Sequence, residues 1–195
     1  MSLQERRERE RTRRAQLIVT TARDLAEAEG WEAVTTRRLA DLIEYSQPVL
    51  YSHFKGKDAI MAAVAVEGFA EIATELRAAR DAAPTARAAL AAVMSAYADF
   101  AERRPALYDA MFVHRVELPF AQPATPVALR EAFAAIRAAV QPFTGDDDLD
   151  VHTEVVWASL HGLVTLMRGG RLPRETHERR LALLLDRFTA PTGDS

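Results

Sequence analysis

The apolar positions of this chain recur mostly at three- and four-residue spacing, which is the period of an α-helix. Between Thr12 and Gly30 the apolar residues are Ala15, Ile18, Val19, Ala22, Leu25 and Ala26. Glycine favours conformations outside the helix, so we expect this first helix to end at Gly30. Residues 1–11 are charged and show no such period, and we expect a frayed, flexible basic arm there.

Two short helices are predicted after Gly30. A hydroxyl at Thr35 or Thr36 can cap the first of them, "TRRLADLI". Ser46 is a candidate cap for the second, and Pro48 falls in its first turn, where a missing N–H costs little. The apolar spacing places five side chains in the core: Leu39, Leu42, Ile43, Leu50 and Phe54.

The rest of the chain is expected to form longer helices separated by proline, glycine and acidic segments. The predicted spans are 57–80, 84–103, 105–113, 126–140, 149–168 and 174–189. The proline-rich "ELPFAQPATP" predicts a loop. We therefore expect an all-α protein of about nine helices, with a three-helix N-terminal head and a larger helical body.

Composition and charge narrow the function classes. The 195 residues contain no cysteine, which excludes a disulfide framework, a thiolate nucleophile and a cysteine-ligated zinc site. Residues 1–57 hold 11 Lys and Arg against 9 Asp and Glu, whereas residues 58–195 hold 14 against 19. This asymmetry fits a DNA-facing head on an acidic body.

Membrane and enzyme functions are not expected. No uncharged apolar run reaches the ~18 residues of a membrane span, and no signal-type segment follows the charged N-terminus, so we predict a cytoplasmic protein. No acidic residue stands three positions before any histidine, as a di-metal carboxylate site requires. "HTE" lacks the cysteine pair of a deaminase, and serine-hydrolase and phosphate-loop signatures are missing. We predict no enzymatic activity, no cofactor and no metal.

The two short helices indicate a function. They are joined by the tight turn "EYS" and supported by the longer helix before them, which is the arrangement of a helix-turn-helix unit. The second helix of such a unit enters the major groove of DNA. A short helix that leaves most of its side chains exposed is therefore expected when its partner is a row of base-pair edges.

The stretch "TTRRLADLIEYSQPVLYSHFKGKDAI" resembles the DNA-binding head of the tetracycline-repressor (TetR) family, and the resemblance covers about residues 12–62. It implies a DNA-binding domain over 1–56 and an effector-binding, dimerising domain over 57–195. It also implies a repressor that a small apolar or amphipathic effector releases from a palindromic operator. The alternatives are an activator, or a helical ligand- or partner-binding relative that has lost DNA binding. "WASLHG" resembles a Trp-x-x-x-His-Gly motif of one branch of the family.

The resemblance implies roles for individual residues of the head. Arg37 resembles a reader of guanine, Gln47 a reader of adenine, and Lys57 a clamp on the DNA backbone. A basic N-terminal segment that includes Arg13 can add contacts. The implied DNA-binding residues are Arg13, Thr36, Arg37, Ser46, Gln47, Pro48, Val49, Tyr51, Ser52, His53, Lys55 and Lys57. Glu44 departs from the glycine often found in the turn, which implies either an unstrained turn or a small backbone penalty.

Two further sets of residues are proposed in the body. Aromatic and methionine side chains suit an apolar effector pocket and suit a plain core equally well. The candidate pocket residues are Tyr97, Phe100, Tyr108, Met111, Phe112, His114, Phe133, Trp157 and His161. The helix over 149–168 is apolar nearly all round, and this suits a homodimer interface. The candidate interface residues are Leu160, Gly162, Leu163, Leu181, Leu184, Leu185 and Phe188. For His161, a hydrogen-bonded histidine at the interface remains an alternative to a ligand contact.

Overall fold

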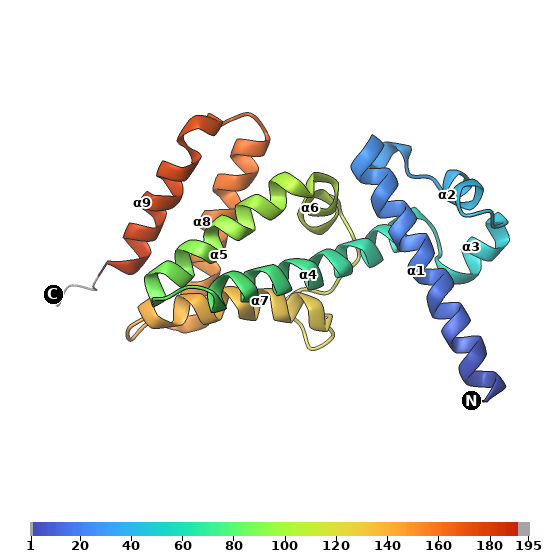
Figure 1. Cartoon of the computed structure of the whole chain (residues 1–195), viewed down its shortest axis with the longest axis horizontal. Coiled ribbons are helices and arrows are strands. Elements are labelled where there is room, and N and C mark those ends of the chain that lie inside the picture. The colour runs from blue at the N-terminus through green and yellow to red at the C-terminus, as the bar shows by residue number, and fades with distance from the viewer. Residues whose placement is uncertain (1, 191–195) are drawn as a thin grey trace. The chain divides into compact units, whose positions relative to one another are not determined.

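The structure, a computed structural model, describes residues 2–190 and confirms an all-α protein over that range (Figure 1). Three short 3-10 helices, η1 (Trp31–Ala33), η2 (Gln141–Phe143) and η3 (Arg174–Thr176), lie between the longer elements. The nine α-helices of the described residues are α1 (Leu3–Glu29), α2 (Thr36–Leu42), α3 (Gln47–His53), α4 (Lys57–Asp81), α5 (Ala86–Arg103), α6 (Pro105–Phe112), α7 (Val127–Val140), α8 (Leu149–Arg168) and α9 (His177–Thr189). No strand occurs in residues 2–190.

The chain divides into two compact units, each made of two separate stretches. The first unit contains the chain up to Gly68 together with Arg104–Pro126. The second contains Phe69–Arg103 together with the chain from Val127 onward. The helix α4 contributes its beginning to the first unit and its remainder to the second. The functional boundary expected after residue 56 stays a prediction.

The expectation of a frayed arm over residues 1–11 is wrong, because α1 already begins at Leu3. Ser2 and Glu5 form a capping box: the Ser2 amide donates to Glu5 Oε2 at 2.8 Å, and the Glu5 amide donates to Ser2 Oγ at 3.2 Å. Arginine and glutamate are strong helix formers, and an i,i+4 pair joins Arg14 to Glu10. The capping box, the helix propensities and this ion pair extend the helix through a segment that lacks apolar periodicity.

The core of the first unit follows the predicted pattern with one correction. Leu39, Ile43 and Leu50 are buried as expected, and Phe54 is half-buried. Leu42, expected in the core, is 54% exposed. Ala40 takes its place, because the buried face of α2 is centred between Leu39, Ala40 and Ile43, and Leu42 lies about a quarter-turn away.

The helix α6 is held within the first unit by α1. Glu27 on α1 accepts hydrogen bonds from the amides of Ala106 and Leu107 at 3.2 and 3.0 Å. These are the second and third residues of α6, whose own N-cap residue makes no side-chain capping bond. A carboxylate also suits the positive end of the helix dipole. The Trp31 indole N–H donates to the Ala106 carbonyl at 2.8 Å and completes the attachment.

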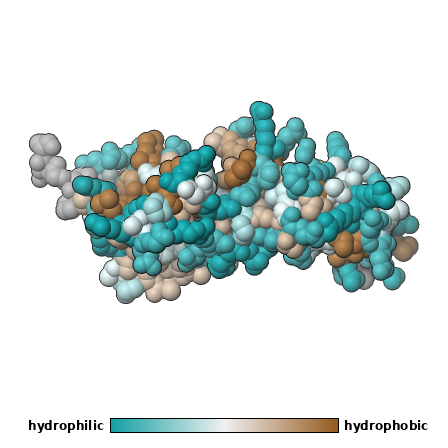
Figure 2. All heavy atoms as spheres, turned by 90° about the horizontal axis from the view of Figure 1, so that it is seen from above, coloured by the Kyte–Doolittle hydropathy of each residue, from teal (hydrophilic) through white to brown (hydrophobic). Residues whose placement is uncertain are grey.

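The second unit is built from the part of α4 after Gly68 together with α5, α7, α8 and α9. Asp148 caps α8 by accepting hydrogen bonds from the amides of Asp150 and Val151 at 2.8 and 3.1 Å. The buried residues of α8 are Thr153, Val156, Leu160, Val164 and Met167. The face of the molecule seen in Figure 2 is mostly hydrophilic, with separate hydrophobic patches. Over the described range, every helix is too short or too polar to cross a membrane.

The capping of α6 by Glu27 makes a stability prediction. Glu27→Ala removes two charge-assisted hydrogen bonds and leaves two amides without their acceptor, so we expect a loss of about 2 kcal/mol in unfolding free energy, measured by urea denaturation. Glu29→Ala on the same helix is the control. Glu29 pairs with Arg38 at 2.5 Å and is about half exposed, so this variant should lose less than about 1 kcal/mol. Equal losses in the two variants would contradict the proposed role of Glu27.

Candidate nucleic-acid interface

The turn between α2 and α3 is closed by backbone hydrogen bonds. The Tyr45 amide donates to the Ala40 carbonyl at 2.9 Å, and the Glu44 amide donates to the Asp41 carbonyl at 3.4 Å. This pair of bonds is a Schellman motif, and it requires a left-handed residue at Glu44, whose φ is 57°. Of the two outcomes that the sequence leaves open at Glu44, the structure has the strained turn, which costs about 1–2 kcal/mol for a residue with a side chain.

The helix α3 presents most of its predicted DNA contacts to solvent. Gln47 and Pro48 in the first turn are exposed, and Val49 is half-buried. Tyr51 is 51% exposed, which is unusual for a large aromatic side chain on a helix this short. Ser46 stands at the N-cap position, as predicted, but its side chain makes no capping hydrogen bond. The underside of α3 is anchored by Leu50, which is fully buried.

The beginning of α2 lies beside α3. Thr35 is the N-cap and accepts a hydrogen bond from the Arg38 amide at 3.1 Å. The Thr36 and Tyr51 hydroxyl oxygens are 3.4 Å apart, so two of the implied DNA-binding residues, from different helices, lie side by side. The two neighbouring arginines differ, because Arg38 forms an ion pair with Glu29 whereas the Arg37 side chain is exposed.

Polar groups at the end of α3 are already engaged within the chain. The Ser52 hydroxyl donates to the Val49 carbonyl at 2.6 Å, so this hydroxyl must rotate before it can donate a hydrogen bond to DNA. The Lys57 ammonium donates to the Trp31 carbonyl at 2.5 Å, while Lys55 is exposed. Burial, followed by the positive charges of Arg11 and Arg14, lowers the pKa of His53. The imidazole is therefore neutral at neutral pH.

The structure does not bring Arg13 together with the end of α3. Two open grooves run along the first turns of α1, and Arg13 lines the one that includes Tyr45. The other groove includes Ser52 and His53, and its arginines are Arg6, Arg7, Arg11 and Arg14. Arg6 and Arg7 were not predicted, because a segment expected to be frayed has no helical faces that would distinguish one arginine from another.

The candidate pocket residues are divided between the two units. Tyr108, Met111, Phe112 and His114 belong to the first, where the His114 ring lies edge-on to Trp31 with centroids 6.1 Å apart. Tyr97, Phe100, Phe133, Trp157 and His161 belong to the second. Four of the nine are fully buried: Tyr97, Phe100, Tyr108 and Met111. A role for any of the nine in effector binding stays a prediction.

Three of these side chains in the second unit form a hydrogen-bonded chain. The Trp157 indole N–H donates to the Tyr97 hydroxyl oxygen at 3.2 Å, and that oxygen is 3.0 Å from His161 Nδ1. The tautomer of His161 sets the direction of the hydrogen bond between the Tyr97 hydroxyl and Nδ1. Burial, followed by the charge of Arg168, lowers the pKa of His161, which agrees with a neutral ring. His161 is thus hydrogen-bonded within its own chain.

The state of His161 predicts a pH dependence of stability. In the unfolded chain the histidine pKa is 6.5, and folding lowers it. The unfolded chain binds more protons than the folded chain in the interval just below that value. The free energy of unfolding is therefore not reduced by His161 above about pH 6.5, and it decreases as the pH is lowered below that value.

His161→Gln should make this loss smaller, because glutamine does not titrate. Urea unfolding midpoints at about pH 7.5 and about pH 5.5 measure the loss in both proteins. Some dependence should remain, since the pKa values of His53 and His177 are also lowered. An unchanged loss in the variant would mean that other groups cause the wild-type dependence.

One candidate interface residue of α8 and α9 is buried, and the others are half-buried. Leu160 is 1% exposed, so the expectation that it lies at a subunit interface is corrected: it belongs to the core of its own chain. Leu163, Leu181, Leu184, Leu185 and Phe188 are half-buried. Phe188 lies 5.8 Å, ring to ring, from His152 of the same unit. Half-burial leaves these five with some surface for a partner.

A different stripe of α8 is exposed and apolar. Val151, Val155 and Leu166 are 56%, 50% and 41% exposed, and Gly162 lies on the same face. A Cβ added at Gly162 would meet nothing within 4 Å, so the backbone is open there. On α9, Leu183 is 57% exposed. In the sequence, the spacing of positions 151, 155, 162 and 166 already places them on one face of the helix. The stripe was not recognised because the other faces of this helix are also largely apolar.

Comparison with known proteins identifies relatives of both parts of the chain. Residues 18–64 match the family model described as bacterial regulatory proteins of the tetR family, and residues 90–188 match that of a tetracyclin repressor-like C-terminal domain. The resemblance of "WASLHG" to one branch of C-terminal domains stays a prediction. No group of three or more potential metal ligands is found among residues 2–190.

Individual relatives agree with these matches. A helix-turn-helix transcriptional regulator of Mycobacterium tuberculosis is 30% identical over 155 residues, which is 78% of this chain and 69% of that protein. The class C tetracycline repressor of Escherichia coli is 46% identical over 48 residues, 25% of this chain and 22% of that protein. A solved structure from Rhodococcus sp. RHA1 superposes with a TM-score of 0.74 at 25% identity, covering 89% of this chain and 92% of the other.

Proposed function

Because the chain belongs to the tetracycline-repressor (TetR) family of transcriptional regulators, we propose that it is a repressor that binds a palindromic operator as a homodimer. A small apolar or amphipathic effector releases it. The observation that carries this proposal is the exposed surface of α3. Beside its exposed residues, Thr36 of α2 meets Tyr51 of α3, so that two phosphate-binding hydroxyls flank the helix that reads bases.

Release by an effector requires that the two units affect one another. Two features support such a link. The helix α4 is continuous from Lys57 to Asp81 and so belongs to both units, and α6 belongs to the first unit although it follows α5 of the second. Because Glu27 and Trp31 attach α6 to α1, an effector that displaces α4 or α6 also acts on the head. It does so to the extent that it binds the DNA-free state more tightly.

Arg37 and Arg38 test the DNA-binding part of the proposal. Arg37→Ala should weaken specific binding about 5- to 150-fold, because a bidentate contact to guanine is worth about 1–3 kcal/mol. Arg38→Ala removes the same charge from the next position, where the side chain pairs with Glu29, and should change binding much less. The assay is fluorescence anisotropy with duplex DNA from upstream of the protein's own gene. Absence of specific wild-type binding at low salt, or equal effects of the two substitutions, would contradict the proposal.

The homodimer is proposed from the exposed stripe of α8. Val151, Val155 and Leu166 form an apolar row that continues past the open backbone of Gly162, where a second helix can approach closely. In a two-fold symmetric dimer the same patch meets its own copy. Such a dimer also suits a palindromic operator, whose half-sites present successive major grooves about one helical turn apart.

Val155→Glu tests the dimer. Symmetry brings two added carboxylates to the same interface, where they repel each other. We therefore expect the dissociation constant of the dimer to rise by about 100-fold or more, measured by analytical ultracentrifugation. Val127→Glu is the matched control, because Val127 lies on α7 and is 59% exposed, compared with 50% for Val155. A dimer that survives Val155→Glu unchanged would place the interface elsewhere.

A further inference from the structure

The side chain of Lys57 is held by the backbone of another part of the first unit. Its ammonium donates to the Trp31 carbonyl at 2.5 Å, and the residue is half-buried. The same carbonyl accepts a hydrogen bond from the Val34 amide at 3.2 Å, which closes the 3-10 turn of η1. Since a carbonyl oxygen accepts two hydrogen bonds, its capacity is filled, and the turn that leads toward α2 fixes its position.

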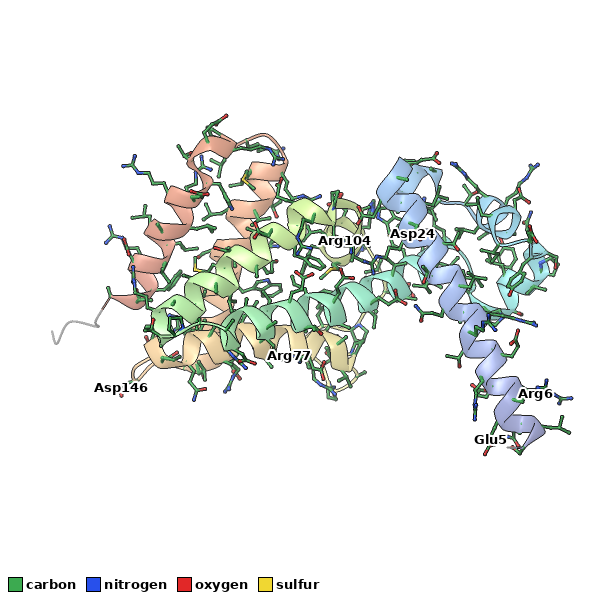
Figure 3. All side chains as sticks on the ribbon, in the orientation of Figure 1. Glu5, Arg6, Asp24, Arg77, Arg104 and Asp146 are labelled. Carbon is green, nitrogen blue, oxygen red and sulfur yellow. The ribbon has the colours of Figure 1, made fainter. Side chains whose placement is uncertain are left out.

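The side chain of Trp31 is fixed by α6. It is 5% exposed, and its indole N–H donates to the Ala106 carbonyl at 2.8 Å, near the beginning of α6. Its ring lies edge-on to the ring of His114, just beyond the end of α6. One tryptophan thus contacts the chain at both ends of an eight-residue helix. Figure 3 shows this region, with Arg104 labelled at the N-cap of α6 and Asp24 labelled on α1.

The bond to Trp31 orders a side chain that is otherwise flexible. A lysine has a four-carbon stem, and fixing it on binding costs conformational entropy. The bond uses one of three ammonium N–H groups, so two remain for a phosphate oxygen. Lys55, two residues earlier, is exposed, and within residues 2–190 its side chain forms no hydrogen bond or ion pair. The two neighbouring lysines therefore differ in how far their ammonium groups are held in place before DNA arrives.

We propose that Trp31 is a positioning residue for DNA binding. Its carbonyl holds the Lys57 ammonium in place for a phosphate of the DNA backbone, and its indole makes this arrangement depend on α6. The inference rests on the proposed function and on the phosphate contact implied for Lys57. Lys57 is 26 positions from Trp31, and Trp31 is 75 positions from Ala106. The helix α6 therefore contributes to the affinity for DNA without touching DNA.

A double-mutant cycle in the full-length protein tests the proposal. Trp31→Phe removes the indole N–H that donates to Ala106 and keeps an aromatic ring in the core. It is combined with Lys57→Met, which removes the positioned ammonium. As the matched control it is combined with Lys55→Met, which removes the same charge from the lysine without an anchor. Circular dichroism and thermal unfolding establish that each variant is folded at the assay temperature. Binding to duplex DNA from upstream of the gene is measured by anisotropy over a range of salt concentrations.

Trp31→Phe should weaken specific binding about threefold to tenfold, both in the wild type and in the Lys55→Met background. In the Lys57→Met background it should change binding less than about twofold, because the group that Trp31 positions is gone. Lys57→Met alone removes one phosphate contact from each subunit of the proposed dimer, so the slope of log affinity against log salt should fall by about 2. A general structural defect in Trp31→Phe would weaken binding equally in all three backgrounds, and that result overturns the inference.

The outcomes separate this inference from the proposed function. If Trp31→Phe does not fold, Glu27→Gln replaces it in the cycle with the same expected pattern, because Glu27 accepts from the Ala106 and Leu107 amides and so holds the same end of α6. If the wild type binds specifically and Lys57→Met binds equally well, the inference is overturned and the proposed function stands. If the wild type does not bind specifically, both are overturned.

Discussion

The carboxylate of Glu27 is the contact on which the first unit depends, because it joins parts of the chain that are far apart in sequence. It stands in for the missing cap of α6 and satisfies two amides that α6 cannot satisfy itself. The same helix is approached closely by α4, since a Cβ at Gly68 would lie 2.6 Å from Met111 Sδ and 2.9 Å from Leu107 Cδ1. A glycine at this point and a carboxylate at Glu27 together fit α6 against the DNA-binding helices.

The helix α1 changes in character along its length. Toward its C-terminal end it has an apolar face that supports α2 and α3, and toward its N-terminal end it is basic and solvent-exposed. The capping box at Ser2 keeps the basic segment helical and so fixes which arginines share a face. A disordered segment of the same composition would present its charges in no fixed direction.

The helices and the helix-turn-helix were predictable because their signals are local: apolar period, caps and breakers. The wrong predictions concern positions where the local sequence pattern was missing or fitted two outcomes equally well. Residues 3–11 lack apolar period, and their helix comes from capping and charge pairs. Leu42 and Leu160 are leucines on amphipathic or apolar helices, and only packing decided that the first is exposed and the second buried. The contact of Glu27 with α6 joins residues about 80 positions apart, and no sequence pattern signals it.

The discontinuity of the first unit has a consequence for biosynthesis. When the ribosome has released residues up to Gly68, the surface around this glycine still lacks Leu107 and Met111, and the Trp31 indole lacks its acceptor on Ala106. At about 5–20 residues per second, synthesis of the intervening segment up to residue 126 takes roughly 3–12 s. During that time the first unit lacks α6, so Glu27 and Trp31 of a chain still on the ribosome have not yet made their contacts with that helix.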